Sequence, residues 1–282
     1  MMKISFFQLL PIFNNLKQNI NLVNEFVDKN RDEIEKTSLL VFPEYFISGP
    51  LDLKSFVSYK KQLEGINILE VFTDISKKFP KTTIIFGSVI LHKKNIYLNS
   101  SLVYLNGQKL GEYDKKALIY NENHICKSTD NYLKFEVNGI KVGVALCWDL
   151  ILPEVFRHYV GEVDLVVIPS FWGLGGNALQ AKYPFSLEKK YYRALCTARA
   201  YENSFAILFV NSVGKYASDF YSDRMMGGSL AVMPPLGETY FTNSKNSKEL
   251  HILDLDFDFL KQYREYYATD KDYKYYKTKN IF

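Results

Sequence analysis

The sequence predicts an α/β protein in which mixed sheets are layered between helices. Short apolar segments such as 38–42 (SLLVF) are typical of strands buried on both faces, and they alternate with segments of helical periodicity. Two Asn-Gly pairs, at 106–107 and 138–139, predict tight hairpins between antiparallel strands. Because strands buried on both faces need helices outside the sheet, this combination favours a layered sandwich over an all-β barrel.

The predicted elements follow one another along 1–282 with no low-complexity linker, internal repeat or change of composition, so we expect a single domain. The first helix is predicted by apolar residues at helical spacing on one face: Leu16, Ile20, Val23 and Val27. Apolar segments predict strands at 38–42, 83–90, 98–105, 132–137, 140–146, 164–168, 205–211, 228–233 and 250–255. Two further helices are predicted at about 153–159, where proline suits the first helical position, and at about 186–202.

The composition is that of a globular protein. Hydrophobic residues make up 47% of the 282 residues and charged residues 23%, which excludes wholesale disorder. The net charge of +4 is too dilute over this length to indicate a nucleic-acid partner. No apolar run reaches the roughly 18 residues that span a bilayer. Gln8 and Pro11 interrupt the apolar N-terminus, which lacks a cleavage site, so we expect neither a signal peptide nor a membrane partner.

The three cysteines are odd in number, far apart and without a Cys-x-x-Cys pair. This pattern excludes a disulfide framework and a cysteine zinc site, and it suits the cytoplasm, where we expect this protein. Cys126 lies in a polar loop and Cys196 inside a predicted helix, whereas Cys147 follows the strand predicted at 140–146. In open α/β sheets this edge is where ligands bind, although a free cysteine also suits a buried core position.

A thiol nucleophile needs a base and a group that stabilises an oxyanion. None of the four histidines lies in a segment typical of a catalytic strand end, so a carboxylate is the alternative base. Glu44 directly follows the strand at 38–42, and Lys115, seven residues before Glu122, follows another strand. Each charge alone could be an ordinary surface residue. A thiol, a carboxylate and an amine at three separate strand ends together favour a catalytic site.

Three segments resemble the motif blocks of the nitrilase superfamily, the carbon–nitrogen hydrolases: FPEYFISG, YDKKALIYNE and CWDLILPE, in that family's order and at similar separations. The resemblance covers nearly the whole chain, from ISFFQLLPIFNNLKQNINLV through RAYENSFAILFVNSVG and GGSLAVMPPLGE to LDLDFDFLKQYRE. The combination is highly specific, although any one block alone would be less so. The resemblance implies a four-layer α-β-β-α sandwich that usually dimerises.

The resemblance also implies a triad of Glu44, Lys115 and Cys147, which requires neither a metal nor an organic cofactor. In such a mechanism Cys147 attacks the carbon of an amide, carbamoyl or nitrile group, and Glu44 acts as general base. Lys115 and the backbone N–H of Trp148 stabilise the oxyanion. A thioester forms, ammonia or an amine leaves, and water hydrolyses the acyl-enzyme. The family's second glutamate, which orients the substrate or the lysine, corresponds to Glu122.

Two positions depart from the family pattern. Asp114 and Ala117 stand where the family often has Arg before the catalytic lysine and His two residues after it. Neither position belongs to the triad. The Tyr-x-Lys spacing and the seven-residue step to Glu122 favour Lys115 over Lys116 as the catalytic lysine.

The residues after the nucleophile bear on the substrate. Trp148-Asp149 is more similar to amidases and N-carbamoyl amidohydrolases than to true nitrilases, which tend to have Trp-Glu. We therefore expect a small-molecule amide or carbamoyl substrate; a nitrilase proper, or a non-enzymatic interaction protein that keeps the fold, is the alternative. Glu122 and aromatic residues near strand ends are expected to contact the substrate, although the aromatic residues also suit a core: Tyr45, Trp148, Phe171 and Trp172.

We expect a homodimer or a higher homo-oligomer. The family usually dimerises, and the helices at 153–159 and 186–202 carry more apolar faces than one layer of a sandwich obviously needs. An extension from about residue 257 is rich in tyrosine and lysine. Its tyrosines could cover apolar surface of a partner subunit, or the extension could fold back on its own subunit.

Overall fold

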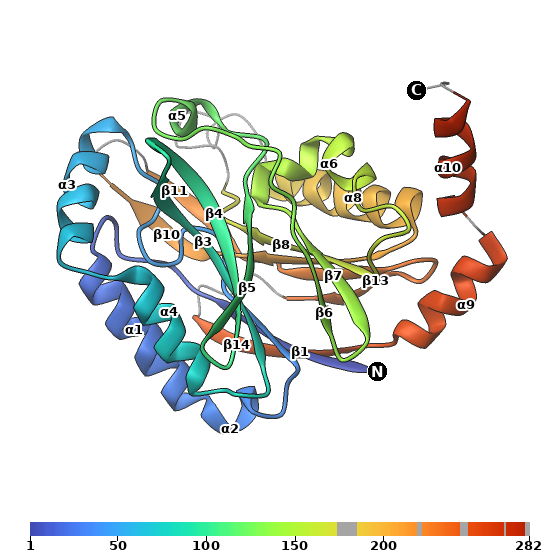
Figure 1. The fold of residues 1–282 in the computed structure, drawn as a ribbon, viewed down its shortest axis with the longest axis horizontal. Helices are drawn as coiled ribbons and strands as arrows, with labels where there is room; N and C mark the ends of the chain where they lie inside the picture. The colour runs from blue at the N-terminus through green and yellow to red at the C-terminus, as the bar shows by residue number, and fades with distance from the viewer. Residues whose placement is uncertain (174–184, 219–221, 243–247, 268, 280–282) are drawn as a thin grey trace.

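The computed structural model describes residues 1–173, 185–218, 222–242, 248–267 and 269–279. Two six-stranded sheets lie face to face, and helices cover the outer face of each (Figure 1). The predicted α-β-β-α sandwich is therefore confirmed. None of the described helices is long and apolar enough to cross a membrane.

The first sheet has the strand order β14-β1-β2-β3-β4-β5. Its β1, β2 and β3 run parallel to one another, and the remaining strands pair antiparallel. The strands are β1 (Met2–Gln8), β2 (Leu39–Val41), β3 (Thr83–Lys93), β4 (Ile96–Leu105), β5 (Gln108–Asp114) and β14 (Glu249–Leu255).

The second sheet has the order β13-β12-β9-β8-β7-β6 and the same plan, with parallel β7, β8 and β9 flanked by antiparallel strands. The strands are β6 (Lys134–Val137), β7 (Ile140–Val144), β8 (Leu165–Ser170), β9 (Ala206–Asn211), β12 (Leu230–Met233) and β13 (Gly237–Phe241). A separate hairpin joins β10 (Val213–Ala217) to β11 (Ser222–Met226).

The helices divide between the two outer layers. The first sheet is covered by α1 (Leu16–Lys29), α2 (Arg31–Ile34), α3 (Leu53–Glu64) and α4 (Ile68–Lys77). The second is covered by α6 (Pro153–Arg157) and α8 (Phe185–Asn203). A short α5 (Tyr120–Asn123) follows β5, and a 3₁₀ helix, η1 (Cys147–Ile151), follows β7. The sequence patterns predicted α1, α6 and α8 but neither α3 nor α4.

Three apolar cores separate the four layers. In β8, Leu165 and Val167 face the space between the sheets, whereas Val166 and Ile168 face α6 and α8. Side chains alternate between the two faces of a strand, so a strand with a core on each side is apolar throughout. This double burial is the physical reason why β2, β3, β7, β8 and β9 were predicted correctly from continuous apolar runs.

Both predicted Asn-Gly hairpins are confirmed. Asn106 and Gly107 connect β4 to β5 with φ angles of 47° and 78°. Asn138 and Gly139 connect β6 to β7 with φ angles of 51° and 79°. Two successive residues with positive φ are what a two-residue hairpin of right-handed twist requires, and Asn-Gly adopts them at the least cost.

The C-terminal extension begins by folding back on its own subunit. In α9 (Phe257–Tyr267), the side chains of Phe257, Leu260 and Tyr263 are buried in the core between the sheets. Arg264 donates to the Val163 carbonyl at 2.6 Å and so fixes the helix to the second sheet. Beyond it, α10 (Thr269–Thr278) continues away from the sheets (Figure 1). Residues 268 and 280–282 of the extension lie outside the described part of the chain.

Candidate active site

The carboxyl ends of parallel strands from both sheets bring the predicted site residues together. Glu44 follows β2, Cys147 follows β7 and Phe171 follows β8. The backbone N–H of Phe171 donates to Glu44 Oε2 at 3.1 Å, which joins the two sheets at this edge. The Cys147 thiol lies beside the Glu44 carboxylate. The hydrogen bond from the thiol lowers the pKa of Glu44, and the negative charge of Glu44 raises the pKa of the thiol.

The Glu44 side chain is 1% exposed, yet its oxygens have several donors. Oε1 accepts from Lys115 Nζ at 2.8 Å and from Asn99 Nδ2 at 3.1 Å. Burial raises the pKa of Glu44 because a desolvated carboxylate is disfavoured, and the positive charge of Lys115 opposes this effect only in part. A carboxylate with a raised pKa is a better proton acceptor than an ordinary glutamate.

The Lys115 side chain is also 1% exposed, and its Nζ lies 2.8 Å from both Glu44 Oε1 and Glu122 Oε1. Burial alone would lower the pKa of Lys115. The two carboxylates more than offset that effect and hold the pKa well above its ordinary value. Lys115 is therefore a fixed, desolvated positive charge beside the thiol.

The neighbouring Lys116 points elsewhere. Its Nζ donates to the Asn131 carbonyl at 2.8 Å and lies 4.3 and 4.5 Å from the ring centroids of Tyr113 and Tyr132. Burial lowers its pKa to about 8. Of the two candidate lysines, Lys115 is the one whose side chain reaches the buried carboxylates.

Cys147 adopts a backbone conformation that is uncommon for a residue with a Cβ atom, with φ of 43°. Such conformations cost about 1–3 kcal/mol and cluster at functional sites. Burial and the Glu44 carboxylate raise the pKa of the thiol, and Lys115 opposes them in part. The resting cysteine is therefore a neutral thiol with a proton acceptor beside it.

A polar network surrounds the Lys115 ammonium. Asn99 in β4 donates from Nδ2 to the Tyr45 hydroxyl and to Glu122 Oε1, both at 3.0 Å, as well as to Glu44. The Tyr45 hydroxyl donates to Glu122 Oε1, and the Ile119 N–H donates to Glu122 Oε2 at 2.8 Å. The structure thus places Glu122 and Tyr45 around the lysine, together with an asparagine that the sequence analysis missed.

Two tryptophans pack in or against the apolar cluster that contains Cys147. Trp148 and Trp172 have ring centroids 5.2 Å apart, and Trp172 belongs to the same apolar cluster as Cys147. The Trp172 indole donates to Glu188 Oε1 at 2.8 Å, and its backbone N–H donates to Asn211 Oδ1 at 2.7 Å. These contacts fix the indole of Trp172 at the strand end where the site lies.

The other cysteines are more deeply buried than Cys147, which hydrogen-bonds the Glu44 carboxylate. Cys126 is 1% exposed because it packs in the apolar cluster between the first sheet and its helices, where the neighbouring Lys127 N–H donates to the Tyr97 carbonyl of β4 at 2.8 Å. Burial raises the pKa of Cys126 to about 12. Cys196 is fully buried in α8, as predicted, and burial raises its pKa as well.

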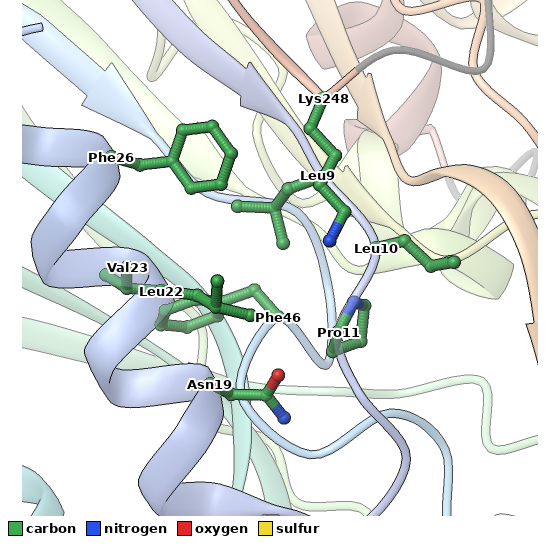
Figure 2. Close-up of a pocket in the computed structure, with 9 residues that line it drawn as sticks. All are labelled: Leu9, Leu10, Pro11, Asn19, Leu22, Val23, Phe26, Phe46 and Lys248. Atoms are coloured by element: carbon green, nitrogen blue, oxygen red, sulfur yellow. The ribbon is translucent and has the colours of Figure 1, made fainter. Parts of the chain in front are cut away.

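A small hollow, shown in Figure 2, lies between α1 and the chain that follows β1. Its volume of about 10 Å³ is room for roughly one water molecule. Apolar side chains such as Leu22 and Phe26 line most of it, and Lys248 is the one ionisable residue among its lining residues. This hollow offers no pair of groups for acid–base or nucleophilic chemistry.

The two stacked sheets between helical layers place the protein in the nitrilase-fold class. A Saccharomyces cerevisiae member of branch 10 of the nitrilase superfamily has a similar structure, with a TM-score of 0.77 and 18% identity over 94% of each chain. The sequence identifies the family: the model of the Carbon-nitrogen hydrolase family matches residues 3–265, so this chain belongs to the carbon–nitrogen hydrolases. The family resemblance seen in the motif blocks is confirmed.

Two relatives show how varied this family is. The chain is 29% identical over 247 residues to an (R)-stereoselective amidase of a Pseudomonas species, covering 87% of this chain and 80% of the relative. It is 27% identical over 237 residues to a probable nitrilase of Schizosaccharomyces pombe, covering 82% of each.

Proposed function

We propose that the protein is a cysteine-dependent hydrolase of a small-molecule amide or carbamoyl compound, with Glu44, Lys115 and Cys147 as its catalytic residues. The observation that carries the proposal is the buried cluster in which Lys115 Nζ lies 2.8 Å from Glu44 and Glu122 beside the thiol. Burying a lysine with two carboxylates costs desolvation free energy that a binding module would have no need to spend. The cluster therefore favours the enzyme over a non-enzymatic protein with this fold.

In the proposed mechanism, Cys147 Sγ bonds to the substrate carbonyl carbon while its proton passes to Glu44. The carbonyl electrons move to oxygen, and the oxyanion is stabilised by Lys115 Nζ and the backbone N–H of Trp148. Collapse of this intermediate breaks the C–N bond, and the proton on Glu44 passes to the leaving nitrogen. The products of this half-reaction are a thioester on Cys147 and free ammonia or amine.

Hydrolysis of the thioester repeats the same steps with water. Glu44 takes a proton from the water as it attacks the thioester carbon, and Lys115 stabilises a second oxyanion. Collapse breaks the C–S bond, returns the proton to the sulfur and releases the acid. No described residue besides these has to change its protonation state.

The choice of an amide or carbamoyl substrate over a nitrile is supported by Trp148-Asp149 and by the similarity to a relative named an amidase. We propose that Trp148 and Trp172 form the apolar wall of the substrate site with Phe171, and that Tyr45 and Glu122 act there through Lys115. Nitrile hydrolysis is the second candidate, because another relative is named a probable nitrilase.

The test is ammonia release from a panel of amides, ω-amides, carbamoyl compounds and nitriles. We expect turnover of an amide or carbamoyl compound, and loss of that turnover when iodoacetamide labels Cys147. Peptide mapping should show Cys147 labelled first, since it is 7% exposed and hydrogen-bonds Glu44, whereas Cys126 and Cys196 are 1% and 0% exposed. Turnover of nitriles alone would favour the second candidate. Full activity with Cys147 labelled would exclude it as the nucleophile.

We also propose that the protein forms a homodimer, with the outer face of α8 at the interface. One argument made from the sequence is wrong: the apolar face of the helix near 153–159 is covered by its own subunit, where Val155, Phe156 and Tyr159 are buried. On α8, however, Tyr191 and Tyr201 are 57% and 54% exposed. Small residues lie between them and line a groove: Ala194, Thr197 and Ala198.

Light scattering at micromolar concentration should give at least twice the mass of one chain. Ala198→Glu places a charge in the α8 groove and should yield single chains, whereas Leu53→Glu, on α3 of the opposite helical layer, should not. A single-chain mass for the wild type at every concentration would contradict the dimer. Oligomers that persist after deletion of the residues beyond 268 would exclude that part of the extension from the interface.

A further inference from the structure

Asp149 is a fully buried carboxylate to which the proposed mechanism gives no role. It lies two residues after Cys147 in the 3₁₀ helix η1, and its two oxygens accept four hydrogen bonds from two segments of the chain. Burial raises its pKa, while the donors around it oppose that shift. Charge-assisted hydrogen bonds are short and strong, so four donors around one carboxylate hold the groups that carry them in fixed positions.

The first segment surrounds Lys115. Asp149 Oδ1 accepts from the backbone N–H groups of Lys116 at 3.0 Å and Ala117 at 2.6 Å. Asp149 Oδ2 accepts from the Tyr113 hydroxyl at 2.7 Å. The carboxylate therefore holds the chain on both sides of Lys115. It binds the side chain of Tyr113 before the lysine and the backbone of Lys116 and Ala117 after it.

The second segment is the turn that carries Cys147. The Leu146 N–H donates to Asp149 Oδ2 at 2.8 Å, and the Asp149 N–H donates back to the Leu146 carbonyl at 2.9 Å. This reciprocal pair closes a turn around Cys147 and Trp148. The same turn holds Cys147 at its positive φ of 43°.

We infer that Asp149 is a positioning residue that sets the distance between Lys115 and Cys147 by binding the backbone of both segments. The inference rests on the proposed function, since it takes Lys115 and Cys147 as the reacting pair. Displacements of about 1 Å at such a pair can cost 10²-fold in rate, so a single clamp on both backbones is an effective way to hold it.

Asp149→Asn is the sharpest test, because an amide has one acceptor oxygen where the carboxylate has two. Whichever way the amide points, its NH₂ group faces either the loop N–H groups of Lys116 and Ala117 or the N–H of Leu146. One of the two segments is then released. The volume of the side chain is unchanged, so the variant tests the hydrogen bonds rather than the packing.

The first readout is the rate at which iodoacetamide alkylates Cys147, measured against pH, which needs no substrate. We expect Asp149→Asn to slow alkylation about tenfold or more near neutral pH, as Lys115 moves away from the sulfur. Removing a nearby negative charge without moving Lys115 would instead ease thiolate formation and speed alkylation. Faster alkylation would therefore overturn the inference, and so would an unchanged rate with only a lower melting temperature.

The second readout is a double-mutant comparison. If Asp149 acts through Lys115, the variant with both Lys115→Ala and Asp149→Asn should react within about threefold of Lys115→Ala alone, since coupled effects are not additive. Rate losses that multiply would show that Asp149 acts independently of Lys115 and would overturn the inference. With a working substrate, Asp149→Asn should lower kcat and leave KM within about threefold, because positioning acts on the chemical step.

A matched control is Asp114→Asn, which alters a buried carboxylate next to Lys115 in sequence. Asp114 binds the hydroxyls of Ser100 at 2.6 Å and Thr129 at 2.8 Å, not the clamped loop, so alkylation should stay within about twofold of wild type. If Asp149→Asn does not fold, Tyr113→Phe removes one of the four bonds and should slow alkylation in the same direction; no slowing would overturn the inference. Failure of every substrate would count against the proposed function alone.

Discussion

Replacing Glu44 with glutamine should lower kcat about 10²–10⁴-fold, the range that a general base contributes. The glutamine fills the same volume, and its single amide oxygen can still accept from one of the two donors, Lys115 or Phe171, so the fold should persist. It cannot take the proton of Cys147 or of water. Steady-state kinetics on the best substrate of the panel measure the effect, and KM should change far less than kcat because the base acts mainly in the transition state.

The pH profile gives the same prediction a second measurement. Because burial raises the pKa of Glu44, the active carboxylate form is lost as pH falls through a value above the ordinary glutamate range. The wild-type rate should therefore rise with pH through that raised pKa, and the residual rate of Glu44→Gln should lack this limb.

Glu112→Gln is the control for Glu44, because Glu112 is a carboxylate on β5 that pairs with Lys93 and Lys109 outside the site. It should retain wild-type kcat. Equal losses in the two variants would indicate a general effect of carboxylate removal and would contradict the role of Glu44.

The sequence patterns predicted those elements whose burial can be recognised from their own residues. Strands such as β8 face a core on each side, so their apolar runs are visible without knowledge of their neighbours. The same logic located the site: Glu44 and Cys147 are polar residues that directly follow such runs, and strand ends of parallel sheets meet at one edge. The motif blocks then supplied the family, which strand ends alone could not.

The two helices that the sequence patterns did not predict, α3 and α4, differ in how clearly their sequences show helical periodicity. In α4, Ile68, Phe72 and Ile75 are buried at helical spacing behind the capping side chain of Asn67, so a periodicity search extended to this segment would have found the helix. In α3 the buried face includes Ser55, whose hydroxyl serves the N-terminal capping box rather than the core. That mixed face gives α3 a weak apolar pattern.

Asn99 and Cys126 depend on contacts that no local pattern contains. Asn99 donates to Glu44, 55 residues away in sequence, and to Glu122, 23 residues away. The sequence contained one indication of this role. Asn99 is a polar residue within the strand predicted at 98–105, and a buried amide side chain needs hydrogen-bond partners. Cys126 was placed in a polar loop because its neighbours in sequence are polar, and its burial arises from packing in the apolar cluster beside β4, where the Lys127 N–H donates to the Tyr97 carbonyl.

Replacing Lys115 with alanine should lower kcat about 10²–10³-fold, the usual cost of losing one oxyanion stabiliser. It also leaves Glu44 and Glu122 buried without their shared cation, and breaking a buried pair in this way typically costs about 3–5 kcal/mol of stability. The kinetics should therefore be measured well below the melting temperature of the variant. Lys115 is the positive charge that lowers the pKa of the Cys147 thiol. Without it the thiolate is harder to form, so alkylation of Cys147 should slow as well.

Lys116→Ala is the control for Lys115→Ala, because it removes a positive charge that lies near the site but does not contact Glu44 or Glu122. The Lys116 ammonium lies against Tyr113, Tyr132 and a backbone carbonyl. The kcat of this variant should remain far closer to wild type than that of Lys115→Ala. A Lys115→Ala enzyme within about threefold of wild type would shift the assignment to Lys116, since removing a true oxyanion stabiliser cannot cost so little. Loss of activity in Lys115→Ala alone, with both variants folded, would identify the buried cation as the group that acts in the transition state.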